Sequence, residues 1–250
     1  MKISTDGLII KEQNIGEQDR LVTVLTRTNG IINAFVKNGR SIKSNKGSAT
    51  RLLCYSRLVI YIKRDTYIID EAQSEEMFIK LRTDIIKMSL AQYFCELAYT
   101  LAPKELPAEE YLRLMLNSLY VLAKGTKEPQ LIKPVFEMRM LAYYGYMPDL
   151  VCCQACKCYE SEEMYFLPKS GLLLCGNCKG ASGEYSIRLS MGVLTALRHS
   201  VYAENGKLFS FNLPKEGLDL LEKTAEEYMQ FHIERSLQTL EFYKTISSTN

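Results

Sequence analysis

The chain has 250 residues, and its 31 lysines and arginines nearly balance 29 aspartates and glutamates, for a formal net charge of +2. Apolar residues make up 47% of the chain and charged residues 24%, which excludes a disordered or fibrous protein. No apolar run approaches the roughly 20 residues of a membrane span, and the first ten residues lack the apolar core of a secretory signal. We therefore expect a cytoplasmic protein of one large domain or two to three small ones.

Basic residues are concentrated near the N-terminus. Residues 20–64 contain ten basic residues and no acidic one, whereas the other 205 residues carry 21 basic and 29 acidic residues, a net charge of −8. Such asymmetry favours a polyanion-binding module joined to a different body. The alternative is a basic face that is merely solvated. The candidate nucleic-acid contacts in this segment are Arg20, Lys37, Arg40, Lys43, Lys46, Arg51 and Arg57.

The same region has the pattern of short strands. Runs rich in β-branched and aromatic residues cover 5–11, 20–26, 30–36, 52–62 and 66–70, and Asn29-Gly30 predicts a hairpin turn between the second and third. Strands of this kind fit a small closed antiparallel barrel of the OB or SH3-like type, and we predict an OB-fold over residues 1–73. Its aromatic residues either fill the barrel or stack on bases; they include Phe35, Tyr55, Tyr61 and Tyr67.

A basic connection follows the third predicted strand. Residues 37–51 mix lysine and arginine with Gly, Ser and Asn, which predicts a mobile loop that is not part of the core. Long cationic side chains on such a loop can follow a phosphate backbone and release its counterions, so we expect salt-sensitive binding that is independent of base sequence.

Helical periodicity begins after Gln73. Ser74 followed by Glu75 and Glu76 predicts a helix start. Helices are expected over 74–102, 107–124 and 131–144, after Ser190, and over 214–245. The predicted fold class is α+β with several domains: the barrel at 1–73, a helical domain at 74–148, a zinc module at 149–184, and C-terminal helices at 185–250 that pack on the helical domain.

Six of the eight cysteines lie between residues 152 and 178. Cys153, Cys156, Cys175 and Cys178 form two C-x2-C pairs separated by 18 residues, a spacing typical of zinc sites. Disulfides are the alternative, which a cytoplasmic location disfavours. Four thiolates leave no position for water, so we predict one structural Zn²⁺ per chain. Cys152 and Cys158 fit this pattern less well and are either spare thiols or neighbours of the ligands. Cys54 and Cys95 are expected to be small buried residues.

Few residues could support catalysis. The chain has two histidines, His199 and His232, and neither lies in a nucleophile-elbow motif. His232-Ile-Glu234 matches half of a zinc deaminase signature, but no P-C-x-x-C follows it. No phosphate-binding loop or dinucleotide fingerprint is present. We expect no catalytic residues and a protein that is not an enzyme.

Two stretches resemble one protein family. The first reads Phe136-Glu137-x-Arg139-x-Leu141-x3-Gly145-Tyr146-x-Pro148-x-Leu150-x2-Cys153-x2-Cys156, and the second follows Phe166 as Gly171-Leu-Leu-Leu-Cys175-x2-Cys178. Together with a basic barrel loop (Gly39, Lys43), they resemble the bacterial RecO recombination-mediator family along essentially the whole chain.

The resemblance implies a mediator of DNA repair and recombination after DNA damage. Such a protein binds single- and double-stranded DNA, anneals complementary strands and, with RecR and RecF in the RecFOR pathway, helps to load RecA onto DNA coated by single-stranded DNA-binding protein (SSB). It would act at the nucleoid and bind the acidic SSB tail, for which Arg113, Lys133 and Arg139 are candidates by charge; Arg139 is equally a candidate for a structural ion pair. The alternative function is a zinc-stabilised scaffold whose basic barrel binds RNA or an acidic protein.

Overall fold

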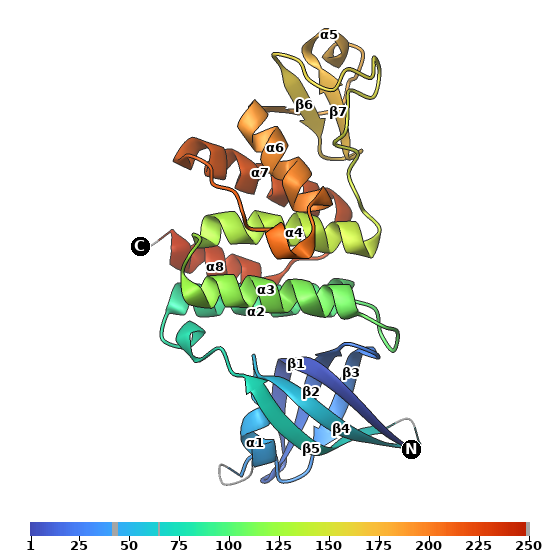
Figure 1. Ribbon diagram of the computed structural model, residues 1–250, viewed down its shortest axis with the longest axis vertical. Helices are drawn as coiled ribbons and strands as arrows, with labels where there is room; N and C mark the ends of the chain where they lie inside the picture. The colour runs from blue at the N-terminus through green and yellow to red at the C-terminus, as the bar shows by residue number, and fades with distance from the viewer. Residues whose placement is uncertain (42–44, 65, 249–250) are drawn as a thin grey trace. The chain divides into compact units, whose positions relative to one another are not determined.

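The computed structural model describes residues 1–41, 45–64 and 66–248, which form two compact units. The first unit comprises Met1–Lys124 together with Leu237–Asn250, and the second comprises Gly125–Ser236. The first unit holds the barrel and the helices α2 (Ile85–Leu101), α3 (Glu109–Lys124) and α8 (Gln238–Ser247) (Figure 1). The second unit holds the helices α4 (Pro129–Tyr144), α6 (Met191–Tyr202) and α7 (Lys215–His232) together with the cysteine-rich module. No helix in the described ranges has both the length and the apolar character needed to cross a membrane.

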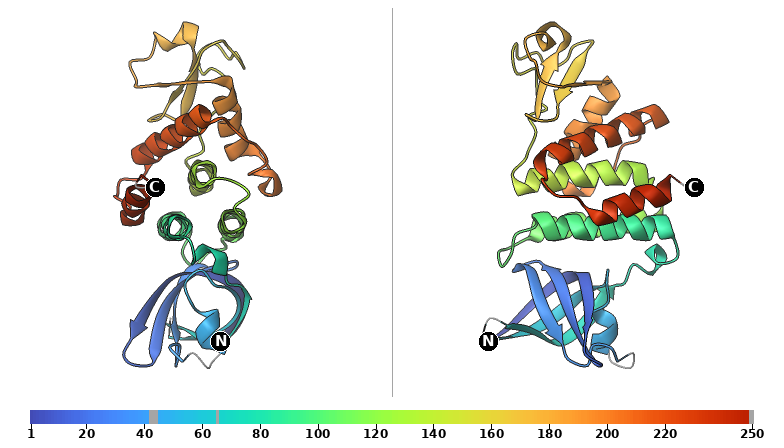
Figure 2. Two further views of the ribbon diagram at one scale, coloured as in Figure 1. Left: turned by 90° about the vertical axis from the view of Figure 1, so that its left-hand side faces the viewer. Right: turned by 180° about the vertical axis from the view of Figure 1, so that it is seen from behind.

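The N-terminal part is a closed five-stranded barrel with strand order β1-β2-β3-β5-β4. Figure 2 shows this barrel from two further sides. Its strands are β1 (Lys2–Ile15), β2 (Asp19–Thr26), β3 (Gly30–Val36), β4 (Tyr55–Lys63) and β5 (Thr66–Glu76). Four of the five strand pairs are antiparallel, and the parallel pair of β3 with β5 closes the barrel. This topology confirms the predicted barrel of the OB type.

Alternation along the strands fills the barrel with aliphatic side chains. Val22, Val24, Ile32, Leu58 and Ile60 are at most 2% exposed and belong to one core cluster. Since successive strand residues point to opposite faces, the residues between them face outward, and the sequence thus specifies the inner and outer faces of the sheet.

The hairpin turn at Asn29-Gly30 also meets the loop between α2 and α3. Gly30 has a φ of +58°, and a Cβ at this position would lie 2.2 Å from the carbonyl oxygen of Pro103. The Ile31 amide donates a hydrogen bond to that same oxygen at 2.9 Å. Glycine is required here for its conformation and for the close approach of two backbones.

The basic connection 37–51 is only partly a surface loop, which corrects the prediction. It contains the short helix α1 (Asn45–Ala49), which Figure 1 shows beside the barrel. Ala49 and Thr50 are at most 1% exposed. Leu53 and Cys54, which follow, are fully buried. Sparse apolar residues among Gly, Ser and Lys hide this burial in the sequence, and the segment therefore contributes to the core.

The first long helix starts later than predicted. Ser74 to Glu76 lie in β5, where they pair with β4, so the predicted helix start at Ser74 is wrong. After the turn η1 (Ile79–Leu81), α2 spans Ile85–Leu101, and its N-cap Asp84 accepts hydrogen bonds from the amides of Ile86 and Lys87. Helix α3 (Glu109–Lys124) packs on α2.

The second unit contains α4 (Pro129–Tyr144), α6 (Met191–Tyr202), the turn η2 (Asn205–Lys207) and α7 (Lys215–His232). Between α4 and α6 lies a three-stranded sheet of order β7-β6-β8, formed by β6 (Met164–Leu167), β7 (Leu172–Cys175) and β8 (Ile187–Leu189), with the short helix α5 (Gly176–Lys179) after β7. Helix α7 packs on α4.

The single long C-terminal helix predicted over 214–245 is instead two helices. Ile233 and Leu237 are extended, and they separate α7 from α8 (Gln238–Ser247). Leu237, Leu240 and Tyr243 are at most 6% exposed, and α8 packs on α2. Burial of this apolar face in the first unit explains the break in the helix.

Candidate metal centre and nucleic-acid interface

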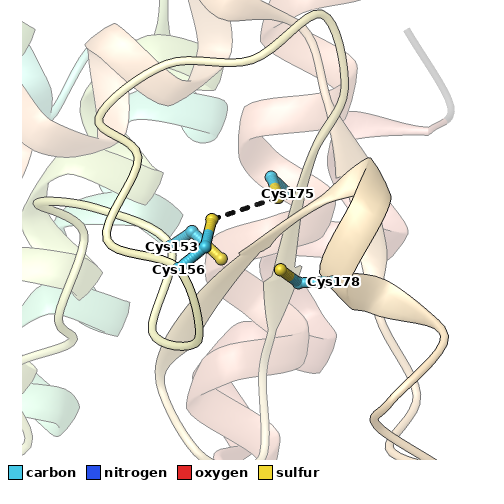
Figure 3. Close-up of side chains that lie close together, drawn as sticks. All are labelled: Cys153, Cys156, Cys175 and Cys178. Carbon is cyan, nitrogen blue, oxygen red and sulfur yellow. Dashed lines mark hydrogen bonds between the residues drawn. The ribbon is translucent and has the colours of Figure 1, made fainter.

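Four cysteines converge in the module of the second unit. Cys153 and Cys156 lie in a turn before β6, Cys175 ends β7, and Cys178 lies in α5 (Figure 3). Their Sγ atoms all lie within 4.8 Å of one another, and those of Cys156 and Cys175 are 3.6 Å apart. The spacing of the two C-x2-C pairs therefore identified a group of thiols that can hold a metal ion.

Backbone hydrogen bonds fix the turn that carries the first pair. The amide of Cys153 donates to the carbonyl of Cys158 at 2.8 Å, and the amide of Gln154 donates to Leu173 of β7 at 2.8 Å. Lys157 adopts the left-handed conformation, with a φ of 63°, and its amide donates back to Cys153. The turn is thereby attached to β7, the strand that delivers Cys175.

The four thiols differ in how readily they ionise. Although burial raises the pKa of Cys153, the backbone amides of Cys156, Cys175 and Ala155 lower it to about 6. Hydrogen bonds to Cys175 and Cys156 raise the pKa of Cys178 to about 12. Thiolates this close repel one another, and a divalent cation would relieve that repulsion. The donor set thus fits a metal that prefers sulfur.

The other cysteines are not part of this group. Cys158 interacts with Cys156 and Cys175, and its hydrogen bond to Cys156 is the main cause that raises its pKa to about 12. Cys152 is half-buried. Cys54 and Cys95 are buried, as expected, and burial raises the pKa of Cys95 to about 12.

Of the seven candidate nucleic-acid contacts, Lys43 lies outside the described residues, and five others reach the barrel surface. Lys37 and Arg40 follow β3 and are exposed, and Lys46 in α1 is half-buried. Arg51 lies 3.8 Å from a carboxylate oxygen of Glu12 with its side chain 53% exposed. Arg57 forms an exposed ion pair with Glu75 at 2.9 Å. Exposed pairs of this kind are weak, so these cations can exchange a carboxylate for a phosphate.

The predicted nucleic-acid contact at Arg20 is wrong. It is 2% exposed, and its guanidinium donates to the carbonyl oxygens of Gly47 and Thr50 at 3.1 and 3.2 Å. Burial is the main cause that lowers its pKa below the usual value. Arg20 therefore anchors α1 to β2 and cannot lie against a phosphate.

Two of the three candidate partner contacts are also buried. Lys133 is fully buried, and its Nζ lies 3.1 Å from Glu137 and 3.5 Å from each of Glu222 and Glu226. Arg139 is 7% exposed and donates to the carbonyl oxygens of Ser200 and Ala203. Neither is a surface contact, because each binds groups within its own unit.

The third candidate, Arg113, is exposed on α3, but both ends of its guanidinium face carboxylates. One nitrogen lies 2.8 Å from Glu109 and another 3.7 Å from Glu110. Its charge is thus balanced locally.

His232 is held by its neighbours. Its Nδ1 lies 2.8 Å from the carbonyl oxygen of Tyr228, and its ring packs against those of Tyr228 and Tyr146 at centroid distances of 4.2 and 4.8 Å. This packing gives His232 a structural role at the end of α7.

The structure separates the barrel aromatics into two groups. Tyr67 packs on the barrel core, and the hydroxyl of Tyr55 donates to Asp6. Phe35 and Tyr61 are 39% and 41% exposed. Two exposed cations, Lys63 and Arg64, lie at the end of β4 near Tyr61 and were not among the sequence candidates. Strand alternation from the buried Ile60 is the signal that could have identified Lys63 as outward-facing.

Comparisons with known proteins agree along the chain. A family model described as "Recombination protein O N terminal" matches residues 1–78, and one described as "Recombination protein O C terminal" matches residues 82–241. A protein named "DNA repair protein RecO" from Acetivibrio thermocellus is 34% identical over 98% of this chain and 97% of its own length. Proteins of the same name from Symbiobacterium thermophilum and Caldicellulosiruptor bescii are 27% and 29% identical, each over 98% of both chains.

Proposed function

The chain belongs to the RecO family of DNA repair proteins, and we propose that it is a recombination mediator that binds single- and double-stranded DNA and anneals complementary strands. It acts in the cytoplasm at the nucleoid, by binding and exchange of strands without bond chemistry. With RecR (and RecF) it helps to load RecA onto DNA coated by SSB, whose acidic tail it binds.

The observation that carries the proposal is the cationic surface of a closed OB-type barrel. Lys37, Arg40, Arg51, Arg57 and Lys63 are exposed on or beside its strands. Cations on such a surface displace counterions from phosphates and reduce the repulsion between two strands held side by side. Annealing needs this screening and no catalytic group.

We also propose that the four-cysteine group holds one structural Zn²⁺, with Cys153, Cys156, Cys175 and Cys178 as thiolate ligands. The ion would attach the turn before β6 to β7 and α5, and closed four-thiolate sites serve structure. Metal analysis of protein purified under reducing conditions should find about one zinc per chain. Protein that folds normally without metal would contradict this assignment.

The decisive experiment measures annealing of complementary single strands coated with SSB. The wild-type protein should accelerate annealing, and its affinity for DNA should fall as salt rises. The double variant Lys37→Glu/Lys46→Glu should bind more weakly, with a salt slope reduced by about one for each phosphate that is no longer bound. Lys215→Glu, an exposed lysine at the start of α7, is the matched control and should change neither quantity.

Two outcomes would overturn the proposal. One is a wild-type protein that does not anneal SSB-coated strands. The other is competition in which RNA or an acidic protein occupies the barrel and excess DNA fails to displace it, which would favour a scaffold function.

A further inference from the structure

A row of apolar side chains crosses the outer surface of the barrel. The strand registers place Leu21 of β2 opposite Phe35 of β3, Phe35 beside Ile68 of β5, and Ile68 opposite Tyr61 of β4. We call these four residues the outer row.

The inner partners show that the outer row faces away from the core. Val22 pairs with Ala34, and Ile69 pairs with Ile60, and all four of these side chains are buried in the barrel. Because neighbouring positions on a strand point to opposite faces, the outer row points outward. Its two aromatic rings are about two-fifths exposed, at 39% and 41%.

Positive charge borders the outer row. Lys37 follows β3 two positions after Phe35, and Lys63 lies two positions after Tyr61, on the same face of β4. Within the described part of the chain, no carboxylate forms a salt bridge with Lys37, Lys63 or Arg64. The acidic neighbour on β5, Asp70, forms an exposed ion pair with Lys2 at 2.7 Å, and Asp19 of β2 accepts a hydrogen bond from the Asn38 amide at 2.9 Å. Exposed aromatic rings beside unneutralised cations match the bases and phosphates of a single-stranded nucleic acid.

We propose that the outer row binds bases of single-stranded DNA, with Phe35 and Tyr61 as stacking platforms and Lys37 and Lys63 on the flanking phosphates. This inference rests on the proposed function and assigns different roles to the cations and to the aromatic rings. Cations serve both single strands and duplexes, whereas the rings serve single strands alone, because bases in a duplex are already stacked on one another.

The dimensions of the barrel suit a short run of nucleotides. Phe35 and Tyr61 lie on strands separated by one other strand, so their backbones are roughly 10 Å apart at about 4.8 Å per strand. At about 3.4 Å per nucleotide in a stacked strand, this distance corresponds to about three nucleotides.

The test compares a single-stranded oligothymidylate with a duplex of equal length. Phe35→Ala and Tyr61→Ala should each weaken binding of the single strand by about 10- to 100-fold, in line with the loss of one stacked base. Duplex affinity and the salt slope should stay as in the wild type. Phe35→Tyr and Tyr61→Phe, which keep the rings, should restore single-strand binding, and Tyr120→Ala, at an exposed tyrosine of α3, is the control.

A second measurement does not require removal of an aromatic side chain. The chain has no tryptophan, so Tyr61→Trp introduces a unique fluorophore into the outer row. Its emission should be quenched by oligothymidylate and unchanged by an abasic oligomer of the same length, while Tyr120→Trp should respond to neither.

The outcomes separate the two proposals. Wild-type protein that binds neither DNA would refute the proposed function together with the outer row. Wild-type protein that binds both, with Phe35→Ala and Tyr61→Ala unchanged on single strands, would refute the outer row alone. Equal losses of affinity for single strands and duplexes would also refute the outer row. So would variants that bind DNA normally but fail to bind RecR.

Discussion

Replacing Lys133 by methionine should destabilise the second unit strongly. The ammonium group is fully buried on α4, 3.1 Å from Glu137, which is also fully buried. Burial lowers the pKa of Lys133, but the carboxylates of Glu137, Glu222 and Glu226 outweigh this and raise it above its usual value, so the side chain is charged. Its removal takes the ammonium group away from the buried carboxylate of Glu137.

The size of the effect follows from that burial. Removing one partner of a buried ion pair costs about 3–5 kcal/mol, whereas replacing both by apolar residues of similar volume is often neutral. We therefore expect Lys133→Met to lose about 3–5 kcal/mol, and Lys133→Met/Glu137→Leu to regain most of it. Lys223→Met, which removes an exposed cation 3.8 Å from Glu227, should cost less than about 1 kcal/mol.

Urea unfolding, together with hydrogen exchange of the α4 amides, measures these differences. The deficit of Lys133→Met should also depend on pH, because loss of the Lys133 ammonium group raises the pKa of the buried Glu137 carboxyl in the folded variant. The penalty is then fully present above that raised pKa and disappears below the unfolded value of about 4.3, where Glu137 is neutral in both states. A loss below about 1 kcal/mol, or a double variant less stable than the single one, would refute the reasoning.

Three further changes test other parts of the structure. Gly30→Ala should destabilise the barrel by more than Gly16→Ala. Both residues have a φ near +57°, but only at Gly30 would the added Cβ lie 2.2 Å from a backbone oxygen. Equal losses of stability in thermal unfolding would contradict the close approach. Hydrogen bonding to Arg27 is the main cause that lowers the pKa of Asp6. This pair therefore stabilises the barrel fully above the unfolded pKa of about 3.9, and the stabilisation is lost as the pH falls through the lower pKa of the folded state. Asp6→Asn should remove that part of the acid dependence, and an unchanged acid titration of urea stability would argue against it. Cys175→Ser should abolish zinc binding and expose the module to proteolysis, and retention of a full equivalent of zinc would refute the ligand assignment.

The barrel and the cysteine group were predictable because local patterns determine them. Period-two alternation marks the strands, and the hairpin at Asn29-Gly30 fixes the register of β2 and β3. Two C-x2-C pairs indicate one site from spacing alone, since each turn presents two thiols. Neither inference needs knowledge of distant contacts.

Other features depend on contacts that the sequence pattern does not reveal. Ser74 precedes two glutamates and satisfies the local rule for a helix start, yet the ladder between β4 and β5 holds it in a strand. The break between α7 and α8 has a similar origin, because Leu237 is buried in the first unit. In both places tertiary packing outweighs local propensity.

Charge on the barrel shows why a count of basic residues overestimates a nucleic-acid interface. Arg20 is used inside the fold, and Arg27 is bound by Asp6 and Glu109 at 2.7 and 2.8 Å. Arg57 faces Glu75. Among the described residues no carboxylate forms a salt bridge with Lys37 or Lys63, and these two exposed lysines flank the two exposed rings of the outer row. Since an uncompensated charge binds phosphate without first breaking an internal pair, the strongest attraction for DNA should lie along the outer row and not evenly over the ten basic residues of 20–64.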